Sequence, residues 1–349
     1  MTKMLAARWY GPEDLRLEEI TTPSPGPGEV LVKVRSALTC GTDFKFFRRG
    51  HAILAKAIPS LFGHEVSGII SGIGSGVVDF KEGDEVVAAN SAPCENCFFC
   101  QKSQYNLCEN LTLINGAFAE SILVPAQIVK KNLYLKPKQL SFRDAASTEP
   151  LASVVRCAEQ IKIHRGEHVL ILGSGPTGLL WVQVAKYYGA KVVVAARTQS
   201  KLDIAKRLGA DDIVLMDGLA AQGSQLKAMI QEKTHPGYGP DVVVDATGQP
   251  EIWELAFDLV RKGGRVSCYG GCKHGTSITL DTHKLHYEEI TVSGIFHHTP
   301  EYFKKALHLI ADGHVKIDTL IQASKPLSKI GEIFQKGVAE TPLKFEIIP

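Results

Sequence analysis

The stretch HVLILGSGPTG, residues 168–178, decides the fold of this chain. It begins with an apolar run typical of a buried strand, and its glycines fit the pattern G-x-G-x-x-G ahead of a helix-forming sequence. In such a unit the first glycine makes a tight turn, the second lets the backbone approach a pyrophosphate, and the third lets the helix pack on the sheet. The helix N-terminus then offers N–H groups to phosphates. We therefore predict a dinucleotide site that includes Gly173, Gly175, Pro176, Thr177 and Gly178.

Strand and helix patterns alternate on the C-terminal side of this loop. Apolar strand-like runs occupy residues 191–195, 241–245 and 265–269, and helical patterns cover residues 200–208 and 252–260. Repeated strand–helix–strand units imply a parallel, doubly wound sheet, so the fold class is α/β.

The N-terminal part has a different character. Residues 29–34, 66–73 and 85–88 alternate as half-buried β-strands do, with glycine and proline between them. The last fifty residues contain an amphipathic helix over 300–312 and a terminal strand over 344–348. A chain of 349 residues is long for one core. We expect three segments: a mostly-β domain over 1–152 with a lobe at 90–110, a dinucleotide-binding domain over 153–292, and a return to the first domain over 293–349.

Composition narrows the classes of partner and compartment. A net charge of +2 gives no reason to expect nucleic acid or a membrane surface as a partner. No apolar stretch approaches the length of a membrane span, and the first fifteen residues lack the apolar region of a signal peptide. Eight cysteines without such a signal predict reduced thiols in a cytoplasm.

The residues after the second strand of the nucleotide unit bear on the choice of cofactor. An acidic residue that binds the adenosine ribose is expected about 20 residues after the glycine loop, but Ala196 and Arg197 stand there. A guanidinium forms a bidentate pair with a 2′-phosphate, whereas a carboxylate would repel the phosphate. We therefore expect NADP(H) in preference to NAD(H). The alternative is that Arg197 only stacks on adenine and both cofactors bind.

Four cysteines lie within fifteen residues, with the spacing C-x2-C-x2-C-x7-C: Cys94, Cys97, Cys100 and Cys108. Four thiolates at one centre make a closed, tetrahedral zinc site with no position for substrate, so the zinc would be structural. The alternatives are buried or disulfide-bonded cysteines, or an iron–sulfur cluster, although its usual run continues C-x3-C-P.

A second group of ligand types is spread over a longer stretch. Cys40, Thr42 and Asp43 follow a predicted strand, and His64 and Glu65 come about twenty residues later. Cysteine and histidine with nearby carboxylates suit a zinc site that keeps one position open. Taken singly, Cys40 fits a core residue and His64 a structural histidine.

Taken together, these motifs resemble those of the zinc-dependent medium-chain dehydrogenases, over essentially the whole chain. The matching motifs are CGTD (40–43), GHE (63–65), KEGDEVV (81–87), the cysteine lobe (94–108), GAFAE (116–120), EPLA (149–152), GSGPTG (173–178) and DATG (245–248). The polyol and L-threonine dehydrogenase branch is the most similar, because it carries Glu-Pro where other alcohol dehydrogenases place a zinc-binding cysteine. The resemblance implies a Rossmann-type domain and a GroES-like catalytic domain with a structural-zinc lobe.

The resemblance also implies roles for individual residues. Cys40 and His64 would bind a catalytic zinc, and Glu65 would be a ligand permanently or at some stage of the cycle. Glu149 would bind the zinc directly or hold its water. Asp43 would accept a hydrogen bond from the other nitrogen of His64. Two further residues complete the set: Thr42 would begin a proton relay, and Thr247 of DATG would contact the cofactor.

The substrate side is less defined. The family often has histidine where this chain has Lys45, so this lysine would end the relay or contact an anionic substrate. Further pocket candidates are Phe118, Phe296 and His297. The alternative for the phenylalanines is a place in the core. We expect the run from Lys45 to Arg49 to be a solvated loop, with a site for a phosphorylated or acidic substrate as the alternative.

The function expected from these features is reversible hydride transfer between NAD(P) and a secondary alcohol, such as a polyol or sugar alcohol. Each chain would bind two zinc ions, one catalytic and one structural. Within enzymes, the alternatives are an L-threonine-type 3-hydroxy-amino-acid dehydrogenase and a simple secondary alcohol dehydrogenase. An alternative of another class is a nucleotide-binding protein with structural zinc only. The resemblance implies a homo-oligomer, with a tetramer expected and a dimer as the alternative.

Overall fold

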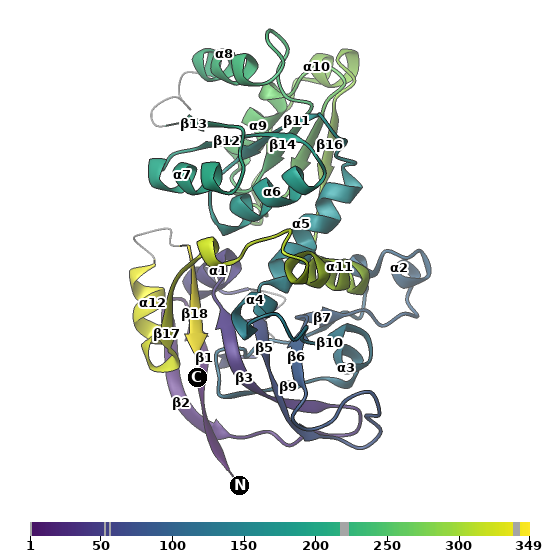
Figure 1. Cartoon of the computed structure of the whole chain (residues 1–349), viewed down its shortest axis with the longest axis vertical. Coiled ribbons are helices and arrows are strands. Elements are labelled where there is room, and N and C mark those ends of the chain that lie inside the picture. Colours follow the sequence, from purple (N-terminus) through teal and green to yellow (C-terminus); the bar gives the residue numbers. More distant parts are fainter. Residues whose placement is uncertain (1, 52–53, 56, 217–222, 338–342) are drawn as a thin grey trace. The chain divides into compact units, whose positions relative to one another are not determined.

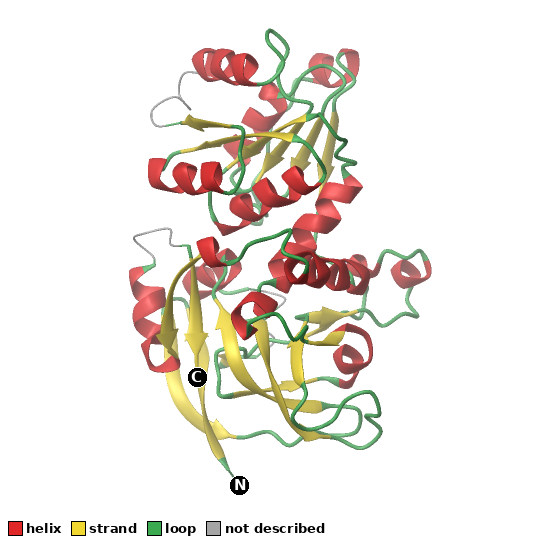
Figure 2. Cartoon of the chain, in the orientation of Figure 1, coloured by secondary structure: helices red, strands yellow, loops and turns green. Residues whose placement is uncertain are grey.

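The computed structural model describes residues 2–51, 54–55, 57–216, 223–337 and 343–349. The chain forms two compact units. The first comprises Met1–Ala152 and His298–Pro349, and the second comprises Ser153–His297. The first is mostly β and the second is α/β (Figures 1 and 2), which confirms the predicted fold class.

The first unit is built mainly from strands. They are β1 (Lys3–Gly11), β2 (Asp14–Thr21), β3 (Val30–Leu38), β4 (Ser60–Leu61), β5 (Glu65–Ile73), β6 (Glu85–Ala88), β7 (Ser91–Ala92), β8 (Thr112–Leu113), β9 (Ser121–Val124), β10 (Leu133–Leu135), β17 (Ile321–Pro326) and β18 (Lys344–Ile348). Its helices are α1 (Gly41–Arg49), α2 (Phe98–Gln101), α3 (Ala126–Asn132), α4 (Phe142–Ala146), α11 (Pro300–Ala311) and α12 (Ile330–Lys336). Helix α5 (Thr148–Gln160) begins in this unit and continues into the second.

The main sheet of the first unit brings distant parts of the chain side by side. Its strand order is β10-β6-β5-β3-β18-β17, and β9 also pairs with β3. Strands β3 and β5 are antiparallel, with Leu38 opposite Glu65. On the other side of β3, β18 returns from the C-terminus and places Glu346 opposite Leu38 (Figure 1). One end of this sheet therefore collects residues from around positions 40, 65 and 344.

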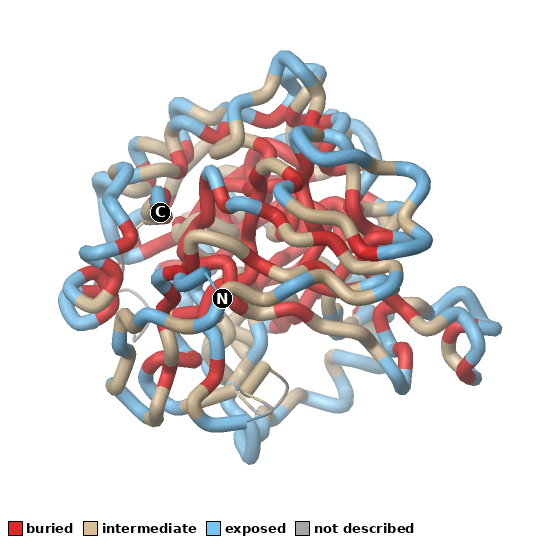
Figure 3. Tube along the Cα trace, turned by 90° about the horizontal axis from the view of Figure 1, so that it is seen from below, coloured by how far each residue is buried: buried red, intermediate tan, exposed pale blue. Residues whose placement is uncertain are grey.

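An aromatic cluster fills the core of the first unit. Phe46 lies 4.9 Å from Phe62 and Phe62 lies 5.1 Å from Phe334, measured between ring centroids. All three are fully buried, as is Phe118 beside them. Each buried phenylalanine contributes about 1.5–3 kcal/mol from the area removed from water. Figure 3 shows such buried segments of the trace in the interior, with exposed turns around them.

The second unit alternates strands and helices. Its strands are β11 (His168–Leu172), β12 (Lys191–Ala196), β13 (Asp212–Leu215), β14 (Val242–Asp245), β15 (Arg265–Cys268) and β16 (Thr291–Gly294). Its helices are α6 (Pro176–Tyr187), α7 (Gln199–Arg207), α8 (Gly223–Lys233), α9 (Pro250–Leu259) and α10 (Thr282–Tyr287).

These strands form one parallel sheet in the order β13-β12-β11-β14-β15-β16. Helices α8 and α9 share an apolar core with one face of the sheet, and α6 contacts β11 and β12 (Figure 1). The strand order reverses between β11 and β14, and in doubly wound sheets ligands bind beyond the carboxyl ends of the strands at this point.

One predicted segment is wrong. The run from Lys45 to Arg49 was expected as a solvated loop, but it lies in helix α1. The reason is local: the Asp43 carboxylate accepts a hydrogen bond from the Cys40 backbone N–H at 2.9 Å, which stabilises a helix start. Phe46 and Phe47 then form the buried face of the helix. Within the described residues, no helix is long and apolar enough to cross a membrane.

Candidate active site and metal centres

The four cysteines of the lobe converge. Their sulfur atoms all lie within 4.8 Å of one another, and Cys97 Sγ is 3.9 Å from Cys108 Sγ. A disulfide would need a separation of about 2.05 Å, so these thiols are not paired. Four sulfurs at about 2.3 Å from a tetrahedral zinc would be about 3.8 Å apart. The donor set and its spacing therefore fit a closed tetrathiolate centre.

Backbone amides prepare part of this lobe for a cation. Hydrogen bonding from the Asn96 backbone lowers the pKa of Cys94 to about 6, and a similar bond from Cys100 lowers that of Cys97. Burial instead raises the pKa of Cys100 to about 12. The thiols of Cys94 and Cys97 thus lose their protons more readily than a free cysteine. The Cys100 thiol would ionise only when the positive charge of a metal ion lies beside it.

A second cluster, mostly buried, forms where strand β3 ends beside the start of the antiparallel strand β5. Cys40 caps the start of α1, and its Sγ lies 3.3 Å from Nε2 of His64. The other ring nitrogen, Nδ1, faces Asp43 Oδ1 at 3.1 Å. Asp43 is fully buried and also accepts from the Cys40 backbone N–H. A carboxylate behind a histidine orients the ring and leaves the opposite nitrogen to bind a metal.

Glycine is required beside this histidine. Gly63 has φ of +91°, and a Cβ there would lie 2.7 Å from Cδ2 of Phe118. The Phe118 ring thus packs against the backbone of Gly63, the residue before His64, and leaves no room for a side chain there. Phe118 is fully buried in this role, so it is a core residue and does not line an open pocket as expected.

Glu65 is bound by a lysine from the far end of the chain. Lys344 Nζ donates to both carboxylate oxygens, at 2.5 and 2.6 Å, and to the Thr39 carbonyl at 2.9 Å. The side chains of Glu65 and Lys344 are almost completely buried. Sequence reasoning missed Lys344, although a lysine opening the apolar strand KFEII was an available signal.

Glu149 lies in the first turn of α5 and is held differently. Asn90 Nδ2 donates to Glu149 Oε1 at 2.9 Å, and His298 Nε2 lies 3.0 Å from Asn90 Oδ1. All three residues are buried. Neither Asn90 nor His298 was predicted from the sequence, because nothing in their local sequence marks them as partners of Glu149.

These groups form one acidic centre. Donor atoms of His64, Glu65 and Glu149 lie within 4.8 Å of one another, as do those of Cys40, Asp43 and His64. Burial raises the pKa of Cys40 and Glu149 and raises that of Glu65 to about 7, against the opposing charge of Lys344. Burial opposes a charged His64, but the charges of Cys40 and Asp43 raise its pKa well above 6.5. Three buried carboxyl groups and the half-buried Cys40 thiol face one lysine, so this donor set suits a divalent cation.

The glycine loop has the geometry that the sequence predicted for close approach. Gly173 has φ of +112°, and a Cβ on Gly178 would lie 2.0 Å from the Gly173 carbonyl oxygen. Gly175 caps α6 and Pro176 occupies its first turn, with Thr177 next. The first N–H groups of this helix therefore point out of a tight backbone turn, which suits an anion.

The strand β14 closes the other side of this loop. Asp245 accepts from the backbone N–H of Thr247 and Gly248, at 2.9 Å each, and from the Thr247 hydroxyl at 2.6 Å. A Cβ on Gly173 would approach Thr247 Cγ2 to 2.9 Å. Thr247 is thus fixed beside the glycine loop, as its assignment to the cofactor site requires.

A positively charged side chain, that of Arg197, follows the end of β12. Ala196 is the last residue of the strand and is buried, and Arg197 follows it and is exposed. Across the described ranges, no carboxylate forms an ion pair with Arg197.

The remaining predicted residues lie in helix α1 of the first unit and at the end of the second unit. Thr42 is half-buried in the first turn of α1, and Lys45 is exposed one turn later. In the second unit, Phe296 is 50 % exposed, and His297 has φ of +66°. The carbonyls of Phe296 and His297 accept hydrogen bonds from Arg156. The structure thus gives Lys45 and Phe296 solvent-facing surfaces.

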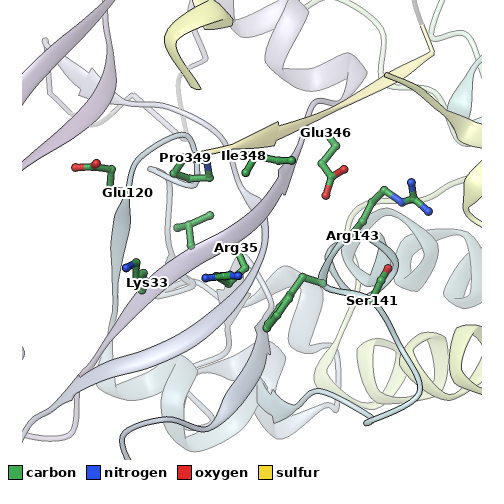
Figure 4. Close-up of a pocket in the computed structure, with 10 residues that line it drawn as sticks. Lys33, Arg35, Glu120, Ser141, Arg143, Glu346, Ile348 and Pro349 are labelled. Atoms are coloured by element: carbon green, nitrogen blue, oxygen red, sulfur yellow. The ribbon is translucent and has the colours of Figure 1, made fainter. Parts of the chain in front are cut away.

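Figure 4 shows an open hollow of about 780 Å³ in the first unit, lined by residues of β3, α4 and β18. Its carboxylates are already bound: Glu346 accepts from Ser36 and Ser324, and Glu120 accepts from the Leu5 N–H. None of the predicted metal ligands lines it.

Comparison with known proteins agrees with this site. A family model described as "Alcohol dehydrogenase GroES-like domain" matches residues 26–134, and one described as "Zinc-binding dehydrogenase" matches residues 176–312. The chain is 32% identical to L-threonine 3-dehydrogenase of Pyrococcus horikoshii over 93% of this chain and 92% of that protein. It is 31% identical to D-arabitol-phosphate dehydrogenase of Enterococcus avium, over 97% and 94%.

A solved structure extends the comparison to the fold. A Sinorhizobium meliloti 1021 protein crystallised bound to NADP has a TM-score of 0.90 and 29% identity to this chain, with full coverage of both. Two matching domains and relatives that span nearly the whole chain identify an oxidoreductase. The chain belongs to the zinc-dependent medium-chain dehydrogenases, in the branch that includes the polyol and L-threonine dehydrogenases.

Proposed function

We propose that this protein oxidises a secondary alcohol, of the polyol or sugar-alcohol class, and reduces the corresponding ketone, with NADP(H) as cofactor. Cys40, His64 and a carboxylate from Glu65 or Glu149 would hold a catalytic zinc, and the four lobe cysteines would hold a structural zinc. The observation that carries this proposal is the part-buried contact of Cys40 Sγ with His64 Nε2, with the Asp43 carboxylate behind the histidine.

The chain's own residues have separate tasks in this reaction. When bound, zinc lowers the pKa of a substrate hydroxyl, and the nicotinamide accepts the hydride. Asp43 keeps the His64 ring in one orientation. Thr42 would accept the substrate proton as it releases its own. Lys45, one helical turn further and exposed, would carry that proton to solvent only if it is present as the neutral amine. Burial of the surrounding carboxylates keeps bulk water from competing for the metal.

A substrate panel tests the proposed reaction. NAD and NADP are each offered with polyols, polyol phosphates, L-threonine and simple secondary alcohols, and nicotinamide reduction is followed by ultraviolet absorbance. We expect the highest kcat/KM with a polyol or its phosphate, as in the D-arabitol-phosphate dehydrogenase relative. A preference for L-threonine would favour the second candidate, supported by the Pyrococcus relative. No reduction with any alcohol by the zinc-loaded protein would contradict the proposal.

The preference for NADP is supported by Arg197 and by the NADP bound to the Sinorhizobium protein. Arg197→Asp places a carboxylate where the 2′-phosphate would lie. The kcat/KM ratio of NADP to NAD should fall by at least about 100-fold, since a charge-assisted pair becomes a repulsion. Arg207→Asp, at the end of the helix α7 that follows Arg197 and also exposed, is the matched control. Equal effects of Arg197→Asp on both cofactors would contradict the phosphate role.

We further propose that the two compact units act as a catalytic domain and a nucleotide domain, and that the chain forms a homotetramer in a cytoplasm. Eight free cysteines support a reducing compartment. The tetramer rests on the resemblance alone. Light scattering after size-exclusion chromatography distinguishes it from a dimer.

A further inference from the structure

A buried carboxylate lies at the end of strand β14, beside the glycine loop. Asp245 is the last residue of this strand and is fully buried. Within the described ranges, no lysine, arginine or histidine forms an ion pair with its side chain. A buried charge is costly unless hydrogen bonds stabilise it. Since β14 and β11 flank the point where the strand order reverses, this charge lies where a doubly wound sheet binds its ligand.

Four donors surround this carboxylate. Oδ1 accepts from the Thr247 backbone N–H at 2.9 Å and from the Thr247 hydroxyl at 2.6 Å. Oδ2 accepts from the Gly248 backbone N–H and from Trp253 Nε1, each at 2.9 Å. The two backbone groups and the indole can only donate, so the carboxyl group serves as the acceptor throughout. The hydrogen of the Thr247 hydroxyl is therefore turned toward Asp245.

This orientation limits what Thr247 can bind. A hydroxyl has one hydrogen and two lone pairs, so Oγ1 is left with lone pairs only for a ligand. The phosphate oxygens of a dinucleotide have no hydrogen to donate, whereas its ribose hydroxyls and its amino groups do. Thr247 Cγ2 would lie 2.9 Å from a Cβ on Gly173, in the loop that suits the pyrophosphate. Because the riboses are joined directly to the pyrophosphate and the amino groups lie at the far ends of the bases, this position favours a ribose hydroxyl as the donor.

The loop after β15 keeps the carboxylate in place. Gly270 donates its backbone N–H to the Asp245 carbonyl at 2.9 Å. A Cβ on Gly270 would lie 2.7 Å from Asp245 Oδ2 and 2.2 Å from the Gly248 nitrogen. Because position 270 has no side chain, this loop packs directly against the carboxylate. The Thr247 hydroxyl is therefore oriented before a cofactor binds, which reduces the entropy cost of binding.

We propose that Asp245 is a positioning residue of the dinucleotide site. It fixes the Thr247 hydroxyl with its hydrogen turned inward, so that Thr247 accepts a hydrogen bond from a ribose hydroxyl of the cofactor. The inference rests on the NAD(P)-dependent function proposed above and deepens its cofactor site. Asp245 acts through Thr247 and does not itself touch the cofactor. If Asp245 only tied the loop after β14 together, cofactor binding through Thr247 would not depend on a ribose hydroxyl.

Analogues of NADPH test this orientation with the unmodified protein. One ribose hydroxyl at a time is replaced by hydrogen or by fluorine, and dissociation constants are measured from nicotinamide fluorescence. Fluorine removes the donor hydrogen but leaves a weak acceptor. At the hydroxyl that Thr247 binds, we expect both replacements to weaken binding by about 10-fold, and its position shows which of the two riboses is bound. Full affinity with fluorine, but a loss with hydrogen, would mean that the Thr247 hydroxyl donates and would overturn the proposal.

A cycle of variants and analogues isolates the contact with Thr247. Thr247→Val removes the hydroxyl with little change of shape and should weaken NADPH binding by about 10-fold. In this variant, replacing the same ribose hydroxyl by hydrogen should cost less than about 2-fold, because its partner is already absent. Thr247→Ser keeps the hydroxyl and should bind NADPH within about 3-fold of the wild type. If Thr247→Val weakens the binding of every analogue as much as that of NADPH, the hydroxyl makes no such bond and the inference fails.

Asp245→Asn tests the positioning role itself. The amide can turn a donor toward the Thr247 hydroxyl, so the coupling between Thr247 and the ribose hydroxyl should fall below about 2-fold. Asp241→Asn is the matched control, because Asp241 is a buried carboxylate directly before β14, where it binds His235 and Arg261. This control should keep the coupling at about 10-fold even if its melting temperature falls. Undiminished coupling in Asp245→Asn would overturn the positioning role, and if this variant does not fold, the fluorine comparison decides.

These measurements separate the inference from the function on which it rests. A protein that binds neither NADPH nor NADH would refute the proposed dehydrogenase, whatever the state of its zinc sites. Nucleotide binding without coupling between Thr247 and a ribose hydroxyl would refute only this inference.

Discussion

The cysteine lobe and the catalytic centre are two candidate metal sites that differ in how far apart their donor residues lie in the sequence. The lobe draws all four donors from Cys94–Cys108, and its apolar cluster consists of those cysteines with Phe99, Tyr105 and Leu111. The catalytic centre draws its donors from the start of α1, the start of β5 and the first turn of α5, and its lysine from β18. We therefore expect the lobe to depend on a metal ion for its stability, and the catalytic centre to keep its shape through the sheet that folds around it.

Loss of Cys40 should give the largest effect on chemistry. Cys40→Ala removes a metal ligand and should lower kcat/KM by about a thousandfold or more, because several kcal/mol of Lewis-acid stabilisation are lost. The melting temperature should change little, since the sheet holds this site. Steady-state kinetics with calorimetry check both parts. Retained activity would remove the catalytic zinc from the account.

Loss of Cys97 should give the opposite pattern. Cys97→Ser opens the tetrathiolate site, so the melting temperature should fall by at least about 5 °C, because structural zinc contributes folding free energy directly. Turnover of the folded fraction should remain near that of the wild type. An unchanged melting curve would show that the lobe does not depend on metal, and the contrast between the two sites would fail.

Asp43 tests the intermediate case, a residue that supports a ligand without being one. In Asp43→Asn the amide still reaches His64 but carries no charge. Catalytic zinc affinity and kcat/KM should each fall by about 10–100-fold. A drop as large as that of Cys40→Ala would mean that Asp43 is itself a ligand.

The smallest effect is expected at the surface of the lobe. Lys131 pairs with Glu95 at 2.7 Å, and their side chains are 28% and 41% exposed. Lys131→Ala should change the free energy of unfolding by about 1 kcal/mol or less, because such pairs are screened by solvent. Urea unfolding measures this. A loss of several kcal/mol would mean that surface charge, and not metal, secures the lobe.

The same contrast explains what the sequence could predict. The lobe and the glycine loop are local patterns. Cys94–Cys108 could be predicted from spacing, and Gly173–Gly178 from spacing together with the strand before it and the helix after it. Strand β11 likewise coincides with the apolar run HVLIL that opens the predicted nucleotide unit. Asn90, His298 and Lys344 were missed because their partners lie 59 to 279 residues away in sequence. Such contacts depend on strand pairing, which residue types in one sequence do not reveal.

Two errors have the same origin. Phe118 was expected at the substrate pocket, but tertiary packing places it under Gly63. The segment from Lys45 to Arg49 was expected as a loop because its charges dominate the local pattern, yet Phe46 and Phe47 anchor it as a helix. In both cases burial against distant residues, invisible in a local window, decides the outcome.

The most direct test of the account follows zinc content and activity together during removal of metal by a chelator. The account predicts two zinc ions per chain, with activity lost in proportion to release of the first and the folded state retained until the second leaves the lobe. Activity that persists after the first zinc is released, or a fully active chain that holds one zinc, would contradict it.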